Sequence, residues 1–175
     1  RFGIFIHMGI YAVKGVAESW SFYNGELTYD DYMSQCAGFT AANYDPVAWA
    51  DLFKRAGARY AVLSTKHHDG VALWDTQLSD LNVVQRTPAR RDLVAPFCKA
   101  IRDAGLNLGL YFSHLDWSHP DYATVLPQRH KDPNDRSPFR MNKWAYPPPG
   151  VPESPERWEN FLKFHRGQLK ELCER

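Results

Sequence analysis

The order helix, glycine, apolar strand and polar loop occurs twice along the chain, and this repeat limits the folds that the chain can adopt. In the first copy, Asp45 and Pro46 are residues expected at a helix start, and Gly57 is a residue expected at a helix end. An apolar strand, residues 59–65, follows and runs into polar residues. Helices that alternate with short apolar strands are typical of an α/β fold with a parallel sheet.

The second copy predicts a helix from about Asp92 to Gly105 and a strand over residues 106–113. A further apolar strand, residues 2–8, opens the chain. Three parallel strands with helices outside them cannot close into a barrel and leave open sheet edges. The predicted fold class is therefore α/β, an incomplete (β/α)8 TIM-like barrel that contains the first three βα units.

The remaining segments predict two more helices and one long loop. A short helix is expected near residues 28–36, and residues 118–152, rich in proline and charge, are expected to form a loop that serves function rather than the core. The last helix is expected to begin at Ser154 and Pro155. Its predicted apolar face comprises Trp158, Phe161, Leu162, His165, Leu169, Leu172 and Cys173.

Charge and composition argue against several classes of partner. The 21 basic and 20 acidic residues give a formal charge of +1, so neither nucleic acid nor an anionic membrane is expected as a partner. No run of about 20 apolar residues is present, so no membrane span is expected. Aromatic residues make up 14% of the chain, a surplus that suits either a heavy core or a carbohydrate site. Cys36, Cys98 and Cys173 show no paired spacing and are expected to be small buried side chains.

Polar and aromatic residues collect at the ends of the three predicted strands. The functional groups of a (β/α) barrel lie where its strands run into the loops that follow them. Several histidines on one rim therefore indicate a binding site. The residues at the three strand ends are His7 for the first, Lys66, His67, His68 and Asp69 for the second, and Tyr111, His114, Asp116 and Trp117 for the third.

These histidines could serve a metal site or a sugar site. Consecutive residues of a strand point to opposite faces, so His67 and His68 are not expected to bind one ion together if the strand continues through them. Neutral histidine can also donate and accept hydrogen bonds with the hydroxyl groups of a ligand. Histidine beside tryptophan, with few carboxylates, favours a neutral polyol, and we expect no metal and no other cofactor.

The charged residues at these strand ends each have a structural alternative to a role in chemistry. Asp69 precedes Gly70 and is expected to form a turn. Lys66 could form a Schiff base, but no second cation stands beside it, and an ion pair is expected. Glycoside hydrolysis needs two carboxyl groups, and the sequence pairs Asp116 with no second acid.

The strand ends and their flanking segments resemble the α-L-fucosidases of glycoside hydrolase family 29. The resemblance rests on residues 1–9 (RFGIFIHMG), 18–20 (ESW), 57–70 (GARYAVLSTKHHDG), 90–94 (RRDLV) and 109–113 (GLYFS). It runs in order from residue 1 to about residue 117 and resumes in the last helix. The block Lys-His-His-Asp-Gly after an apolar strand is fairly specific, and the His-x-Gly end of the first strand adds to it.

The resemblance also implies which residues contact the sugar. The family's sugar-binding positions correspond here to His7, Trp20, His67, His68 and Tyr111. Ser19 stands where the family usually has the glutamate that precedes the tryptophan, and Glu18 lies one residue earlier. Met8 stands where the family usually has tryptophan. Glu18, Asp116 and Trp117 are further candidates for the site.

The mechanism of the family is retaining. An aspartate attacks the anomeric carbon, and a carboxylic acid protonates the leaving oxygen. The family's nucleophile lies at the end of the fourth strand, and no strand follows the last helix of this chain. The resemblance therefore implies that residues 1–175 are the N-terminal part of a single glycoside hydrolase catalytic barrel domain, truncated before the fourth strand and without a catalytic carboxylate.

The resemblance implies that the full-length protein is a retaining, exo-acting α-L-fucosidase, which removes terminal α-L-fucose from fucosylated oligosaccharides or glycoconjugates. The fragment alone would hold part of the sugar subsite without turning over substrate. A secreted, periplasmic or lysosomal location is implied, with a targeting segment that the chain does not include. Two alternatives stay open, namely a non-catalytic sugar-binding relative on the same barrel and a metal-dependent barrel hydrolase.

Overall fold

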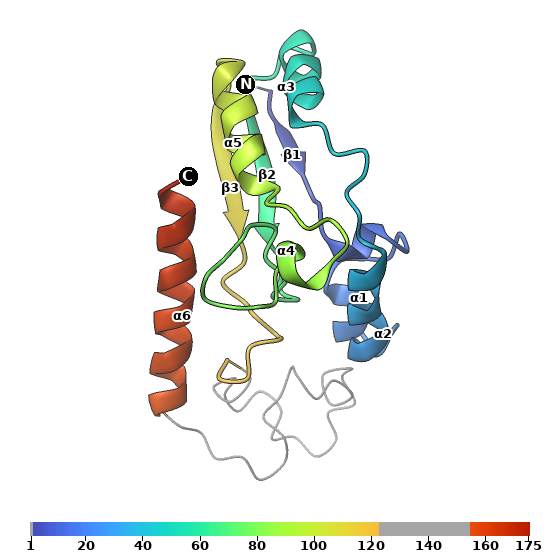
Figure 1. Ribbon diagram of the computed structural model, residues 1–175, viewed down its shortest axis with the longest axis vertical. Helices are drawn as coiled ribbons and strands as arrows, with labels where there is room; N and C mark the ends of the chain where they lie inside the picture. The colour runs from blue at the N-terminus through green and yellow to red at the C-terminus, as the bar shows by residue number, and fades with distance from the viewer. Residues whose placement is uncertain (1, 123–154) are drawn as a thin grey trace.

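The computed structural model describes residues 2–122 and 155–175, and its centre is a parallel sheet (Figure 1). The sheet contains three strands in the order β1 (Ile4–Ile6), β2 (Tyr60–Lys66) and β3 (Asn107–Phe112). Both pairs of neighbouring strands are parallel. The predicted α/β class and the three predicted strands are therefore confirmed, and the described residues form an open sheet.

The central strand, β2, carries the most buried part of the sheet. Ala61 and Leu63 are completely buried. A side chain in place of Gly109 on β3 would put its Cβ atom 2.9 Å from Cγ2 of Val62, so glycine permits the close pairing of these two strands. The register of the pair shifts between Ser64 and Lys66. The regular pairing is thus interrupted among the polar residues at the end of β2, and it resumes with Lys66 opposite Phe112.

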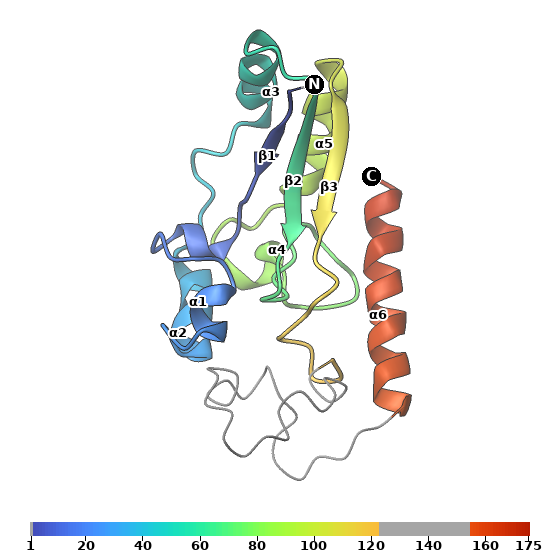
Figure 2. The same ribbon diagram turned by 180° about the vertical axis from the view of Figure 1, so that it is seen from behind.

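Two helices, α3 (Pro46–Arg55) and α5 (Val94–Asp103), lie side by side on one face of the sheet, as the two opposite views show (Figures 1 and 2). Each helix buries its apolar stripe, with Phe53 on α3 and Phe97 and Ile101 on α5 among the buried residues. Burial of this kind supplies most of the stability of a short helix. The two helices therefore form the outer layer over the strands.

The ends of these helices follow the predicted signals. Asp45 accepts hydrogen bonds from two backbone N–H groups in the first turn of α3, at 3.1 and 2.9 Å. Asp92 does the same for α5, at 2.8 and 2.9 Å. Gly57 and Gly105 have φ angles of +83° and +74°, in the left-handed region that ends a helix. The predicted starts and ends of both helices are confirmed.

Short helices gather near the carboxyl ends of the strands (Figure 1). The helix expected near residues 28–36 is divided, because its first part is α-helical and its second part has the tighter 3-10 geometry. Thr28 caps the first part by accepting a hydrogen bond from the N–H of Asp31. The short elements are η1 (Ile10–Ala12), α1 (Trp20–Tyr23), α2 (Tyr29–Met33), η2 (Ser34–Gly38) and α4 (Val83–Arg86).

The last helix, α6 (Pro155–Cys173), lies beside β3 in both views (Figures 1 and 2). The Glu171 carboxylate attaches it to the rest of the chain by accepting hydrogen bonds from Nε1 of Trp74 at 2.8 Å and from the N–H of Gln77 at 2.9 Å. The predicted cap Ser154 and most of the predicted loop 118–152 lie outside the described residues. No helix in the described part of the chain is long and apolar enough to cross a membrane.

The predicted apolar face of α6 is correct in part. Phe161 and Leu172 are buried, as expected. Cys173 is exposed, so its predicted burial is wrong; it lies about 100° around the helix from Leu172. Gln168, which was not predicted to face inward, is completely buried because its amide oxygen bonds a buried charge described below. Among the other cysteines, Cys98 is buried and Cys36 is half-buried.

Asp45→Ala should lower the free energy of unfolding by about 1 kcal/mol, because two N–H groups of α3 lose their acceptor. Urea unfolding of the intact protein, followed by circular dichroism, would measure the change. Asp51→Ala is the matched control, since Asp51 is an exposed carboxylate of the same helix that only pairs with Arg55. Equal effects of the two substitutions would contradict the capping role of Asp45.

Candidate functional site

Four of the predicted site residues meet at the carboxyl edge of the sheet. His7 follows β1, His67 and His68 follow β2, and Tyr111 belongs to β3. The ring of His7 lies 5.2 Å from that of His67 and 5.9 Å from that of Tyr111, measured between centroids. The His67 and Tyr111 rings lie 6.1 Å apart. Three parallel strands therefore deliver their side chains to one place, as the sequence predicts.

Trp20, from α1, joins this group through His68. Their ring centroids lie 5.6 Å apart, and both rings contact Trp117, at 5.3 Å from Trp20 and 4.7 Å from His68. Trp20 is 38% exposed, whereas Trp117 is 3% exposed. Tyr23 stacks on Trp117 at 4.3 Å. The ring of Trp20 is thus partly accessible, and it packs edge-on against the buried ring of Trp117.

The two adjacent histidines do not point to opposite sides. β2 ends at Lys66, and the chain then turns, with the N–H of Gly70 donating to the carbonyl oxygen of His67 at 3.1 Å. The ring centroids of His67 and His68 lie 4.1 Å apart. Opposite faces were expected only if the strand continues through both residues, and β2 ends before them.

Both histidines are neutral at ordinary pH. Burial lowers the pKa of His67 to about 3 and that of His68 to about 4, because removal from water disfavours the charged imidazolium. His7 adds to the lowering of the pKa in each case, because two imidazolium charges so close together would repel each other. Neutral imidazoles can exchange hydrogen bonds with uncharged ligand groups.

Glu18 lies at the border of this group. Its Oε1 atom is 4.0 Å from Nε2 of His7. Among the described residues, His7, Glu18 and His67 each offer a possible metal-ligand atom, all within 4.8 Å of one another. Ligand atoms around a tetrahedral zinc ion lie about 3.3 Å apart, so this group would have to contract to hold one.

Asp69 is a turn residue, as expected. Its Oδ1 atom accepts from the N–H of Val71 at 2.9 Å, and its Oδ2 atom accepts from the hydroxyl of Tyr32 at 2.6 Å. Burial raises the pKa of Asp69 to about 6. Both oxygens are therefore engaged inside the protein.

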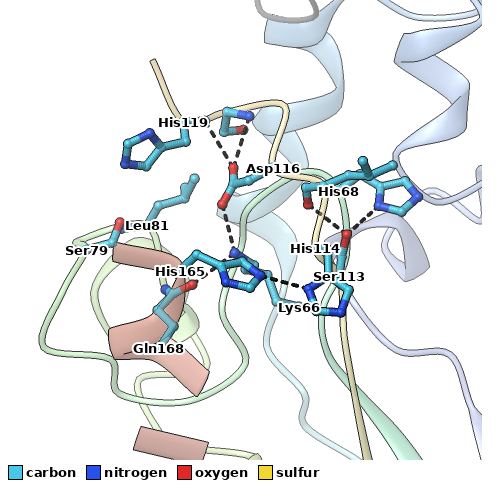
Figure 3. A network of polar contacts seen from close by, with 12 residues as sticks. Lys66, His68, Ser79, Leu81, Ser113, His114, Asp116, His119, His165 and Gln168 are labelled. Atoms are coloured by element: carbon cyan, nitrogen blue, oxygen red, sulfur yellow. Dashed lines mark hydrogen bonds and ion pairs between the residues drawn. The ribbon is translucent and has the colours of Figure 1, made fainter. Parts of the chain in front are cut away.

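Lys66 and Asp116 form a buried ion pair (Figure 3). Nζ of Lys66 lies 2.9 Å from Oδ2 of Asp116 and donates to Oε1 of Gln168 at 2.9 Å. The other oxygen of Asp116 accepts from the N–H groups of Ser118 and His119. The expected ion pair of Lys66 is confirmed, and Asp116, a candidate for the site, is turned toward the interior with 2% exposure.

Two serines complete the histidine group and were not predicted. Ser19 Oγ lies 2.7 Å from Nδ1 of His67, and Ser113 Oγ lies 2.5 Å from Nδ1 of His68. Ser19 drew notice in the sequence only as a departure from the family pattern. No spacing or periodicity marks either hydroxyl, because each reaches its histidine across a sequence separation of 45 residues or more.

Two cavities adjoin the group without containing the histidine pair. One, of about 600 Å³, is lined by Tyr29, Arg86, Asp116 and His119 among others. The second, of about 440 Å³, is bordered by His7 together with Tyr44 and Trp49. His67 and His68 are 5% and 8% exposed, and Trp20 beside His68 is 38% exposed.

Comparison with known proteins gives one consistent family. The model of the family described as Alpha-L-fucosidase matches residues 1–175. The tissue alpha-L-fucosidase of Bos taurus is 36% identical over 137 residues, which cover 70% of this chain and 29% of that protein. An alpha-L-fucosidase of Branchiostoma floridae is 34% identical over 163 residues, which cover 83% of this chain and 33% of that protein. The chain thus spans about a third of the length of these relatives.

Solved structures agree with this likeness. Alpha-L-fucosidase isoenzyme 1 from Paenibacillus thiaminolyticus superposes with a TM-score of 0.79 at 40% identity, covering 98% of this chain and 37% of that one. The alpha-L-fucosidase AlfC from Lactobacillus casei, in complex with its alpha-L-fucose product, gives a TM-score of 0.62 at 31% identity, over 68% of this chain and 40% of that one. The family match over the full sequence, together with the shared fold, shows that this chain belongs to the alpha-L-fucosidase family of glycoside hydrolases.

Proposed function

We propose that the whole protein is a retaining, exo-acting α-L-fucosidase and that this chain supplies part of its fucose subsite. The observation that carries the proposal is the convergence of His7, His67, His68 and Tyr111 at one sheet edge. Trp20 adds an accessible ring beside them. The substrates would be fucosylated oligosaccharides or glycoconjugates.

The chemistry of this group suits an uncharged sugar. Neutral histidines offer hydrogen bonds to hydroxyl groups without a net charge that would attract an anion. An exposed aromatic ring can lie against the apolar face of a sugar ring. Fucose presents both kinds of surface, namely hydroxyls and an apolar face.

The catalytic carboxylates are proposed to lie in the part of the whole protein that this chain does not include. Asp69 and Asp116 are buried with their oxygens engaged by protein donors. One related enzyme from Bacteroides thetaiotaomicron is described as a trapped covalent intermediate with 2-fluoro-fucosyl fluoride. A covalent intermediate is what a retaining mechanism requires, and it supports that mechanism here.

We also propose that the three described βα units are the first part of a (β/α)8 barrel domain to which residues 1–175 belong. The parallel order β1-β2-β3 and the helices on one face fit that architecture. The functional groups lie at the carboxyl ends of the strands, as they do in such barrels. Export to a lysosome, a periplasm or the medium remains an expectation from family resemblance; one human relative is named plasma alpha-L-fucosidase.

His67→Ala in the whole protein should lower kcat/KM for a chromogenic α-L-fucoside by about 100-fold or more, because a buried hydrogen-bonding partner of the sugar is lost. Steady-state kinetics with matched thermal unfolding would separate this effect from a loss of stability. His114→Ala is the control, since His114 is exposed and pairs with His165 instead. Unchanged kinetics for His67→Ala would remove this residue from the site.

A wild-type protein that binds fucose but cleaves no fucoside would favour the non-catalytic alternative.

Removal of divalent metals should leave the activity unchanged. The mechanism proposed needs no metal, although His7, Glu18 and His67 lie near enough to raise the question. Dialysis against a chelator, followed by assay and elemental analysis, would test this. Stoichiometric zinc whose loss abolishes turnover would favour the metal-dependent hydrolase instead.

A further inference from the structure

The two adjacent histidines are both held through their Nδ1 atoms by serine hydroxyls. Ser19 Oγ lies 2.7 Å from His67 Nδ1, and Ser113 Oγ lies 2.5 Å from His68 Nδ1. All four residues are at most 8% exposed. A neutral imidazole carries one N–H and one lone pair, so the hydrogen in each serine contact decides what the other nitrogen, Nε2, offers to a ligand.

The hydrogen in the His68 contact can be assigned. Ser113 Oγ donates to the carbonyl oxygen of Leu115 at 2.7 Å. A carbonyl oxygen can only accept, so the single hydroxyl hydrogen of Ser113 lies in that bond. Ser113 must then accept from His68, whose Nδ1 carries the hydrogen. Nε2 of His68 keeps its lone pair, and Figure 3 shows this second nitrogen pointing away from Ser113.

In the His67 contact the roles are reversed, with the serine as donor and the imidazole as acceptor. Ser19 Oγ accepts the backbone N–H of Asp69 at 2.8 Å, and its own hydrogen is left to donate. Two acceptors are near, namely Nδ1 of His67 and the hydroxyl oxygen of Tyr32. The imidazole lone pair is the stronger acceptor, and Ser19 Oγ lies 2.7 Å from it, at hydrogen-bond distance. Ser19 therefore donates to Nδ1, and Nε2 of His67 carries the hydrogen.

We propose that Ser19 and Ser113 act as positioning residues that hold His67 and His68 in opposite tautomers. The site then presents a hydrogen-bond donor at Nε2 of His67 beside an acceptor at Nε2 of His68, on rings whose centroids are 4.1 Å apart. Burial keeps both rings neutral, so neither becomes a donor at both nitrogens near neutral pH.

This pairing selects the chemical class of the ligand. A hydroxyl group both donates and accepts, so one hydroxyl or two neighbouring ones can satisfy both nitrogens. Carboxylate and phosphate oxygens only accept, and they would face the lone pair of His68 without a hydrogen to offer. The inference rests on the proposed function only for the identity of the sugar; the tautomers themselves are a property of the free protein.

Nitrogen NMR of the whole protein, labelled with ¹⁵N in histidine, would test the assignment without substrate. An unprotonated ring nitrogen resonates well downfield of a protonated one. We expect the unprotonated nitrogen to be Nδ1 in His67 and Nε2 in His68, with signals assigned by their loss in His67→Gln and His68→Gln. The same tautomer in both histidines would overturn the proposal.

Serine variants test the cause of the two tautomers. Ser113→Ala should shift His68 toward the Nε2–H form and lower kcat/KM for an α-L-fucoside about tenfold, as expected for one lost hydrogen bond. Ser113→Thr keeps a hydroxyl and should restore both readouts, whereas Ser19→Ala should change His67 and leave His68 unchanged. Ser79→Ala is the control, since that hydroxyl only accepts the N–H of Leu81. Loss of activity in Ser113→Ala with an unchanged His68 spectrum would overturn the positioning role.

The two proposals fail separately. A wild-type protein with opposite tautomers and no activity on any α-L-fucoside would overturn the proposed function and leave the tautomer assignment intact. An active fucosidase with identical tautomers would overturn the assignment alone.

Discussion

The buried ammonium group of Lys66 is the charge around which the carboxyl end of the sheet is arranged. An isolated charge in the interior costs several kcal/mol, so it needs the Asp116 carboxylate and the Gln168 amide oxygen at 2.9 Å each. Lys66 ends β2, Asp116 follows β3, and Gln168 belongs to α6. Three segments that are distant in sequence must therefore meet at one atom. Asp116 also limits the turn after the histidines, because a Cβ atom at Gly70 would lie 2.7 Å from its Oδ1.

In this arrangement the charged side chains are buried, and the candidate site beside them is made mainly of histidines and aromatic rings. The ion pair and the Asp69–Tyr32 bond are buried within the protein, whereas the neighbouring patch consists of neutral histidines and aromatic rings. Since the two histidines directly follow Lys66, the last residue of β2, fixing the lysine also fixes the start of the turn that carries the histidines. The buried ion pair of Lys66 and Asp116 thus holds in place the segment that carries the two neutral histidines.

The sequence predicted the features that depend on local chemistry. Asp45 and Asp92 at helix starts, and Gly57 and Gly105 at helix ends, act within a few residues of where they stand, so their roles can be recognised without a structure. The strand ends also converge as predicted, because parallel strands deliver their carboxyl ends to one edge.

The features that were missed depend on contacts between distant segments. The burial of Gln168 follows from a lysine 102 residues away, and hydrophobic periodicity cannot reveal it. The convergence of His67 and His68 depends on where β2 stops, and the bounds of a strand are the least certain part of a sequence-based prediction. The roles of Ser19 and Ser113 depend on single hydrogen atoms, which no residue pattern records.

Phe5 gives the site a property that its polar residues do not have. Phe5 belongs to β1 and His7 follows the strand, and their rings stack with centroids 5.2 Å apart. Phe5 also meets Tyr111 edge-on at 5.7 Å. Phe5 therefore packs an apolar ring, itself 52% exposed, against both His7 and Tyr111. A smaller side chain at Phe5 would remove packing that His7 and Tyr111 share, while every hydrogen-bonding group of the candidate site is retained.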